Sequence, residues 1–148
     1  MTEKENMKDG VVETFYKNGK PDGLWEVYNE NGEDISNGLW EGFHENGQLE
    51  QKGNYKIGKR DDLWEGFDEN GQLRRRSNYK DGELDGLYEW FYENGQLETR
   101  GNFKDDEKHG LWEEFYENGQ LKGKGNYKDG EEDGLLEVFD EDGNLTKT

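Results

Sequence analysis

The chain has 148 residues and carries 19 Lys and Arg against 37 Asp and Glu, so that its formal net charge is −18. The length suits one domain, and a mean hydropathy of −1.43 with no long apolar run argues against a membrane span or a signal-peptide core. The absence of cysteine excludes disulfides and thiolate chemistry and favours a cytoplasmic protein, while the acidic charge disfavours direct binding to nucleic acid or anionic membranes.

Composition and residue order point in opposite directions. Aliphatic residues are few and the net charge is high, which is typical of disordered chains. The chain nevertheless contains 5 Trp, 8 Tyr and 7 Phe, and these aromatic residues recur at regular intervals. The regular placement predicts an ordered repeat protein.

The N-terminal part is the least regular. Residues 1–9 are expected to be a frayed lead-in. Related stretches begin at Val11 and Leu24, a spacing near half of that found later, so we expect residues 10–37 to form irregular hairpins that cap the array.

The rest of the chain is a tandem repeat of 24 residues. Four full units span residues 38–61, 62–85, 86–109 and 110–133, and a truncated unit spans 134–148. Each full unit reads approximately Gly-Leu-Trp-Glu-x-Phe-x-Glu-Asn-Gly-Gln-Leu, followed by Gly-Asn-Tyr-Lys and an acidic loop. The Asn-Gly dipeptide between two aromatic stretches predicts one β-hairpin per unit.

The hairpin register follows from the turn. A two-residue type I′ turn at Asn118-Gly119 sets Trp112 opposite Gly125 and Glu113 opposite Lys124. The same spacing pairs Trp40 with Gly53, Trp64 with Ser77, Tyr88 with Gly101, Glu41 with Lys52, Glu65 with Arg76 and Glu89 with Arg100. A three-residue turn with a bulge at the glycine would instead place Leu111, Phe115, Leu121 and Tyr127 on one face. We favour the first register, because it gives every unit an aromatic residue over a small one and an opposite-charge pair.

The predicted fold is all-β: an elongated single-layer meander of stacked hairpins with eleven or twelve strands. At the usual strand spacing the sheet would run about 55 Å. Each unit would contact only its neighbours, and the exposed end strands could pair with a second copy of the chain.

The pattern Gly-x-Trp-x-x-Phe-Tyr-x-Asn-Gly followed by Gly-x-Tyr resembles the MORN repeat. The form with Glu-Asn-Gly-Gln-Leu is most similar to the bacterial variant found in the YwqK-type antitoxin family, over residues 10–148. This resemblance implies a β-hairpin solenoid that acts as a binding scaffold, and in bacteria an antitoxin or immunity protein that neutralises a toxin.

The residues give little support for catalysis. His44 and His109 occupy different places in the repeat, and no Ser, His and Asp set recurs around them. A repeated Glu at positions 26, 41, 65, 89, 113 and 137 is better explained as a ladder of ion pairs than as an active site, since an active site needs one asymmetric group of residues. No cofactor is expected, and a small hydrolase is the weakest alternative.

Two further features have a structural and a functional interpretation. The loops at residues 81–86 and 129–134 weakly resemble the start of a calcium loop, but Tyr92 and Asp140 stand where the final Glu ligand would be. Arg74, Arg75 and Arg76 form a basic run that either neighbours the repeat acids or contacts a partner.

The candidate binding surface is the aromatic stripe of Trp25, Trp40, Trp64, Tyr88 and Trp112. These side chains pack along the stack or, where uncovered, form an acid-rimmed groove. The residues before and after the repeated Phe vary between units and would share this face. The proposed contact residues are Trp40, Trp64, Trp90, Tyr92, Trp112, Tyr116, Glu114 and Asp68.

The sequence therefore favours a non-enzymatic protein-binding scaffold, in its sharper form an antitoxin that occludes a basic toxin domain. A surface of charge −18 would attract such a partner. The alternative is a structural or self-assembling scaffold that has no toxin partner.

Overall fold

The computed structural model describes residues 2–7, 10–17, 20–21, 26–28 and 37–148, with side chains from residue 37 onward. Its secondary structure is entirely β, which confirms the predicted fold class. In this part of the chain no helix is both long and apolar enough to cross a membrane.

The strands form two antiparallel sheets. The N-terminal sheet contains β1 (Thr2–Met7), β2 (Gly10–Lys17), β3 (Lys20–Pro21) and β4 (Glu26–Tyr28). The main sheet contains β5 (Gly38–Phe43), β6 (Leu49–Lys56), β7 (Lys59–Phe67), β8 (Leu73–Lys80), β9 (Glu83–Phe91), β10 (Leu97–Lys104), β11 (Glu107–Phe115), β12 (Leu121–Lys128), β13 (Glu131–Glu132), β14 (Glu137–Phe139) and β15 (Leu145–Lys147).

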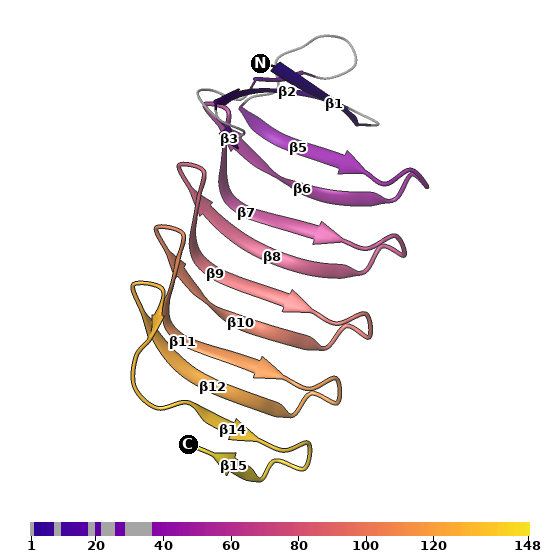
Figure 1. Ribbon diagram of the computed structural model, residues 1–148. Coiled ribbons are helices and arrows are strands. Elements are labelled where there is room, and N and C mark those ends of the chain that lie inside the picture. The colour runs from indigo at the N-terminus through magenta and orange to yellow at the C-terminus, as the bar shows by residue number, and fades with distance from the viewer. Residues whose placement is uncertain (1, 8–9, 18–19, 22–25, 29–36) are drawn as a thin grey trace.

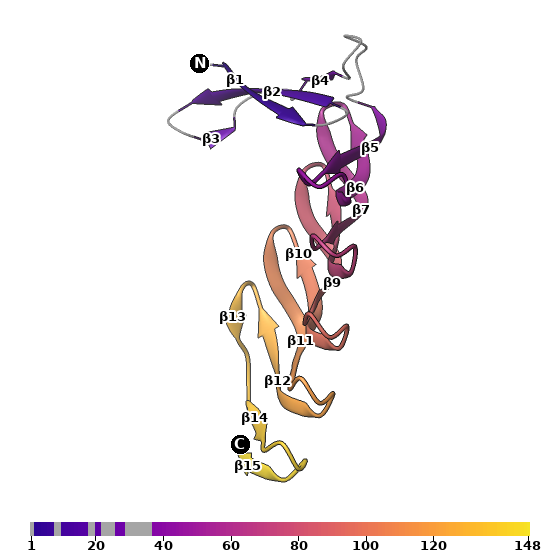
Figure 2. The same ribbon diagram turned by 90° about the vertical axis from the view of Figure 1, so that its right-hand side faces the viewer.

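The main sheet is an open, elongated meander of 11 strands. Consecutive strands lie side by side from β5 to β12 and then through β14 to β15, and the turns line up along the two sides of the array (Figure 1). Seen along its edge the array is a single thin layer, and β1 and β2 lie across its N-terminal end (Figure 2). Burial therefore comes from side chains of adjacent repeats.

The predicted pairing is confirmed, but the predicted turn is wrong. Trp112 pairs with Gly125 and Glu113 with Lys124, and the other three units pair in the same way. Near the turn, however, Phe115 pairs with Leu121. The Tyr116 N–H donates to the carbonyl of Gln120, and the Gly119 N–H donates to the carbonyl of Tyr116. Only the glycine of the Asn-Gly pair has positive φ, at 88°. The turn therefore has three residues.

A bulge restores the register that the turn shifts. Between Glu114 and Phe115 the pairing slips by one residue, so that Lys122 is the extra residue on β12. The two irregularities cancel, which is why a wrong turn type predicted the right partners. Leu111, Phe115 and Leu121 share a face as the alternative register proposed, but Tyr127 lies on the opposite face beside Trp112.

Two-residue turns occur at the other end of the strands, between repeats. Lys128 pairs with Glu131, and both Asp129 and Gly130 have positive φ, at 51° and 84°. This geometry is that of a type I′ turn, for which Asp-Gly is a preferred sequence. The loops that weakly resembled calcium loops are thus tight hairpin turns.

The N-terminal sequence behaves differently from the prediction. Residues 2–7, expected to be frayed, form β1 and pair with β2 along their whole length, whereas residues 1 and 8–9 lie outside the described part. The backbone register places Glu26 opposite Glu13 in the N-terminal sheet, outside the main sheet that carries the other repeated Glu positions. The expected stripe residue Trp25 also lies outside the described residues.

The two faces of the main sheet differ in chemistry. One carries Trp40, Trp64, Tyr88 and Trp112 and is called the Trp face. The other carries the repeated Glu and Phe residues and is called the ladder face. The core belongs to the Trp face, since Trp40, Tyr55, Trp64 and Trp112 are the buried hydrophobic residues of the described part.

Candidate functional site: the Trp face

The rings of the Trp face form two contiguous clusters. Trp40, Tyr55 and Trp64 pack with ring centroids 5.0–6.0 Å apart. Further along the array, Tyr88 contacts Trp90, Phe103 and Trp112, which in turn contacts Tyr127. Edge-to-face and tilted arrangements dominate, and these are favourable for aromatic pairs.

Glycine explains how the indoles become buried. Gly53 pairs with Trp40 within its own hairpin, yet the ring that covers it is that of Trp64 in the next repeat. A Cβ at Gly53 would lie 2.2 Å from Cδ2 of Trp64, and one at Gly101 would lie 2.1 Å from Cδ2 of Trp112. The aromatic-over-small arrangement therefore joins neighbouring repeats.

A hydrogen bond fixes each of these indoles. Trp64 Nε1 donates to the carbonyl of Asn54, and Trp112 Nε1 donates to that of Asn102, both at 3.0 Å. These bonds also cross from one repeat to the next. Buried Trp residues are normally satisfied in this way.

The contact between the second and third full units departs from this scheme. Ser77 stands at the glycine position and is fully buried, and the aromatic residue of the next repeat is Tyr88 instead of Trp. The Ser77 hydroxyl has no hydrogen-bond partner in the described part of the chain. The smaller phenol ring thus accompanies a residue whose Cβ occupies the space that an indole uses elsewhere.

Cationic side chains cover some of the rings. The Arg60 guanidinium lies 4.4 Å from the Trp64 ring centroid and 5.5 Å from that of Tyr79, and it donates to the Tyr79 hydroxyl. The Lys108 ammonium lies 4.6 Å from Trp112 and 5.0 Å from Tyr127. Cations placed over aromatic faces are attracted by the ring quadrupole.

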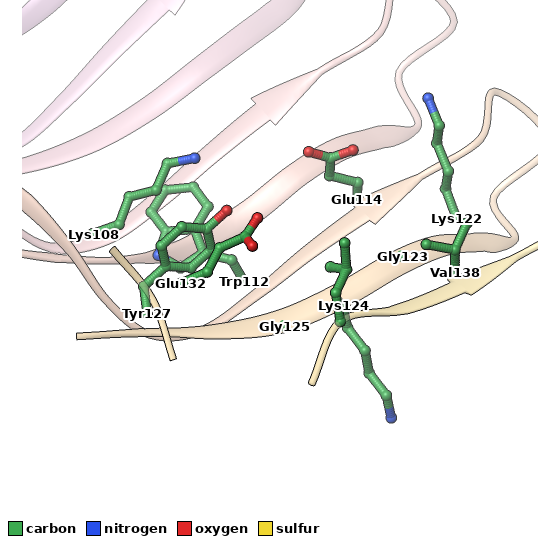
Figure 3. A pocket seen from close by; sticks show the side chains of 11 residues that line it. Lys108, Trp112, Glu114, Lys122, Gly123, Lys124, Gly125, Tyr127, Glu132 and Val138 are labelled. Carbon is green, nitrogen blue, oxygen red and sulfur yellow. The ribbon is translucent and has the colours of Figure 1, made fainter. Parts of the chain in front are cut away.

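Two neighbouring hollows open on the Trp face and share Lys108 and Trp112. The first, of about 390 Å³, lies over β9–β11. Its lining residues are Leu84, Tyr88, Trp90, Glu98, Thr99, Phe103, Lys108 and Trp112. The second, of about 190 Å³, continues toward the C-terminal repeat. Figure 3 shows the second hollow: Glu114 and Lys122 project from the same side of the sheet, and Lys124 points the opposite way.

The predicted contact residues fall into two groups. Trp40, Trp64 and Trp112 are 2%, 1% and 6% exposed, so they form the base of the surface. Trp90, Tyr92, Tyr116 and Asp68 are half-buried and Glu114 is exposed. Of the eight, the structure brings Trp90, Trp112 and Glu114 to the hollows. The role of these residues as partner contacts stays a prediction.

The position after the repeated Phe links adjacent turns. Tyr92 Oη donates to the carbonyl of Phe115, and Tyr116 Oη to that of Phe139, both at 2.7 Å. His44 Nε2 lies 2.9 Å from the carbonyl of Phe67 in the same arrangement. These side chains therefore hold the stack together at its turn side.

Asp68 cannot make this bond, because a carboxylate has no proton to donate. Arg74 of the same repeat replaces it and donates from Nε to the carbonyl of Phe91 at 2.8 Å. Arg75 lies over the Trp90 ring at 5.9 Å, and Arg76 contacts Glu65 and Glu89. All three arginines of the basic run thus have contacts within the fold.

The ladder face places the predicted opposite-charge residues opposite one another, and most of its ion pairs join neighbouring hairpins. Glu and Lys or Arg alternate across nine consecutive strands of the main sheet. The ion pairs are 2.8–3.9 Å long: Arg76 contacts Glu65 within one hairpin, and the others link adjacent hairpins. The positions are Glu41, Lys52, Glu65, Arg76, Glu89, Arg100, Glu113, Lys124 and Glu137. The repeated Glu therefore has a structural role.

Three tyrosines and one aspartate of the main sheet have pKa values shifted by their surroundings. Burial raises the pKa of Tyr88, Tyr92 and Tyr127, and nearby carboxylates raise the pKa of Tyr92 and Tyr127 further. Hydrogen bonds from the backbone of Asn144 lower the pKa of Asp140. Within the described ranges, no three His, Cys, Asp or Glu side chains are grouped so as to hold a metal ion.

The cations over the rings were missed by the sequence analysis. A signal existed, because Arg60 and Lys108 each stand four residues before the repeated Trp, at Trp64 and Trp112. The bulge in β7 and β11 brings that position over the ring, and the bulge itself is not visible in the repeat pattern.

Comparison with known proteins gives one family. Five segments of the chain match the MORN repeat variant family: residues 8–22, 36–56, 63–81, 84–105 and 108–129. The segments from residue 36 onward each cover most of one hairpin unit. No curated protein matches the chain.

Proposed function

The chain belongs to the MORN repeat variant family, and on that premise we propose that it is a non-catalytic scaffold that binds a basic protein on its Trp face. Repeat scaffolds present one extended surface on which individual positions vary. The observation that carries the proposal is the pair of adjoining hollows with an aromatic base over β9–β14. Trp and Tyr are favoured anchors at protein interfaces.

Charge supports a basic partner. The chain has a net charge of −18, and Glu98, Glu114 and Glu132 line the two hollows. Complementary charge accelerates encounter and disfavours acidic competitors. The surface thus combines apolar contact area with a negative rim.

The sharper proposal is an antitoxin or immunity protein that acts in the cytoplasm and occludes a basic toxin domain. It is supported by the net charge and by the resemblance of the repeats to those of bacterial antitoxins. A toxin that acts on nucleic acid needs a cationic surface, and an acidic sheet face could cover that surface.

The test is binding and protection with a panel of purified basic toxin domains, measured at low and high salt. We expect one toxin to be bound and inhibited, with affinity falling as salt rises. Glu114→Lys should weaken the complex at least about tenfold. Glu83→Lys is the matched control, because Glu83 is exposed and lines neither hollow.

Failure of the whole panel to bind would remove the antitoxin proposal. Equal loss of binding in both lysine variants would show that net charge alone, and not the Trp face, attracts the partner. If the wild type protects against a toxin and Glu114→Lys does not, the result supports both the binding scaffold and the antitoxin proposal.

Self-association is a second candidate, because the main sheet is open at its C-terminal end. Among the described residues β15 pairs with β14 alone, and Leu145 is exposed. A free edge offers unpaired backbone groups to another strand. Light scattering at increasing concentration tests this candidate, and a constant monomer mass would exclude it.

A further inference from the structure

The position that places a cation over the Trp64 and Trp112 rings holds an uncharged residue before Tyr88. Arg60 covers Trp64 and Tyr79, and Lys108 covers Trp112 and Tyr127. The equivalent position, four residues before Tyr88, is Leu84. Leucine supplies apolar contact at this position but no positive charge.

The larger hollow lies where that cation would stand. Leu84 lines it together with Tyr88, Trp90 and Phe103. Tyr88 and Phe103 meet edge to face at 5.3 Å, and Tyr88 and Trp90 are stacked at 6.5 Å. Three rings therefore surround a space of about 390 Å³ that opens to solvent.

A carboxylate adds negative charge to this hollow. Glu98 lines it, at the position where the neighbouring repeats have Arg74 and Lys122. Burial raises the pKa of Tyr92, and Glu98, Glu117 and Glu114 raise it further. This direction agrees with a negative potential here.

The nearby cations already contact rings at the margin of the hollow. Lys108 lines the hollow at its Trp112 end, where its ammonium lies over Trp112 and Tyr127. Arg75 lies 5.9 Å from the Trp90 ring and is not among the residues that line the hollow. Among the described residues no cation is placed over the Tyr88 or Phe103 ring and no ion pair engages Glu98, so these groups can receive a cation from outside.

We propose that the hollow bounded by Leu84, Tyr88, Trp90, Phe103 and Glu98 binds an arginine or lysine side chain of a partner protein. The inference deepens the proposed function and rests on it. The partner's cation would take the place over the rings that Arg60 and Lys108 take within the fold, with Glu98 as its counter-ion.

The probe is the peptide acetyl-Gly-Arg-Gly-amide, with its neutral citrulline counterpart as control. Binding is followed in the full chain by the NMR shifts of the Trp90 indole N–H and the Thr99 amide. We expect the arginine peptide to shift both signals in a saturable way. The citrulline peptide should bind at least about fivefold more weakly.

Leu84→Arg is the decisive variant, because it supplies the missing cation from within the chain. Arg60 shows that the fold accepts arginine at this place in a repeat. We expect peptide binding to weaken at least about fivefold in Leu84→Arg and in Glu98→Gln. Leu87→Arg is the matched control, since it adds the same charge to β9 at an exposed position on the ladder face, and it should keep binding within about twofold.

Three results would overturn the inference: equal binding of the citrulline peptide, unchanged binding by Leu84→Arg, or equal loss in Leu87→Arg. The proposed function is judged separately by the toxin panel. A toxin that binds the wild type and Leu84→Arg equally would leave the scaffold proposal intact and remove the cation site. A panel that does not bind the wild type at all would remove the antitoxin proposal and leave the peptide result to judge the cation site.

Discussion

The indole of Trp64 occupies the space in which a side chain at Gly53 would begin. A Cβ built on Gly53 would lie 2.2 Å from Cδ2 of the ring, far inside van der Waals contact. The two residues belong to adjacent hairpins, and the indole N–H bonds to the carbonyl of Asn54 beside the glycine. This contact between a ring and the backbone sets how closely two repeats approach.

Gly53→Ala should therefore destabilise the protein strongly. Trp64 is 1% exposed and cannot move aside, so we expect the free energy of unfolding to fall by about 1–3 kcal/mol. Urea denaturation followed by circular dichroism measures the change. Gly66→Ala is the control, because its Cβ would meet no atom closer than 3.8 Å, and the substitution should change stability by less than about 0.5 kcal/mol.

Ser77 and Tyr88 should be energetically coupled. Tyr88→Trp alone would press an indole against the Ser77 side chain, whereas Ser77→Gly together with Tyr88→Trp recreates the pairing of the neighbouring repeats. We expect an interaction energy of about 1–3 kcal/mol in a double-mutant cycle, with the double variant more stable than Tyr88→Trp. Additive effects would show that the glycine and the indole are independent.

Reversing one charge of the ladder should destabilise the protein, and exchanging the two residues of an ion pair should not restore its stability. Arg100 lies between Glu89 and Glu113, so Arg100→Glu replaces two attractions by two repulsions and should cost about 1–3 kcal/mol. Adding Glu113→Arg repairs one contact but sets two cations side by side at Lys124. Thermal unfolding at low and high salt checks this, and the deficit of both variants should shrink as salt rises. Full recovery in the swapped variant would mean that the pairs act separately.

A tyrosine at residue 68, the position after the repeated Phe, should take over the hydrogen bond that Arg74 makes. Arg74→Ala leaves the Phe91 carbonyl without this donor, for an expected loss of about 1 kcal/mol. Asp68→Tyr in the same chain should restore stability, because Tyr92 and Tyr116 make the equivalent bond in their repeats. No recovery in the double variant would show that Arg74 stabilises the fold in another way.

Alkaline pH should weaken the stack through its tyrosines. Burial and neighbouring carboxylates raise the pKa of Tyr92, so the folded state favours the protonated phenol, which donates to Phe115. This contribution is complete below the ordinary pKa of about 10 and is lost as pH rises through the higher folded value. Tyr92→Phe should have a lower melting temperature than the wild type at pH 8. As pH rises further, its melting temperature should fall less than that of the wild type. A parallel fall in both proteins would contradict this assignment.

The repeat period predicted much of the fold, because each unit forms the same hairpin and pairs with its neighbours in the same way. The wrong feature was local: Asn118-Gly119 suits a two-residue turn as well as a three-residue one, and the difference depends on φ at Asn118. Lys122 shows why the pairing was still right, since the bulge at this residue compensates for the longer turn.

The candidate surface was harder to predict. The repeat pattern shows that Trp64 occupies the repeated ring position and Trp90 the variable one, but it does not show that the first is buried over Gly53 and the second half-buried beside a hollow. The cations at Arg60 and Lys108 reach the rings only because β7 and β11 are bulged. Contacts between repeats therefore decided which aromatic side chains remain accessible.

The alternation of charge along the ladder face limits how an array of this kind can change its length. Each hairpin contributes one anion and one cation in a fixed order, as Glu113 and Lys124 do. Duplication or loss of a whole 24-residue unit preserves every opposite-charge neighbour, whereas gain or loss of a single strand would bring like charges together at the junction. Related proteins that descend from such a gene are expected to differ in length by whole 24-residue units.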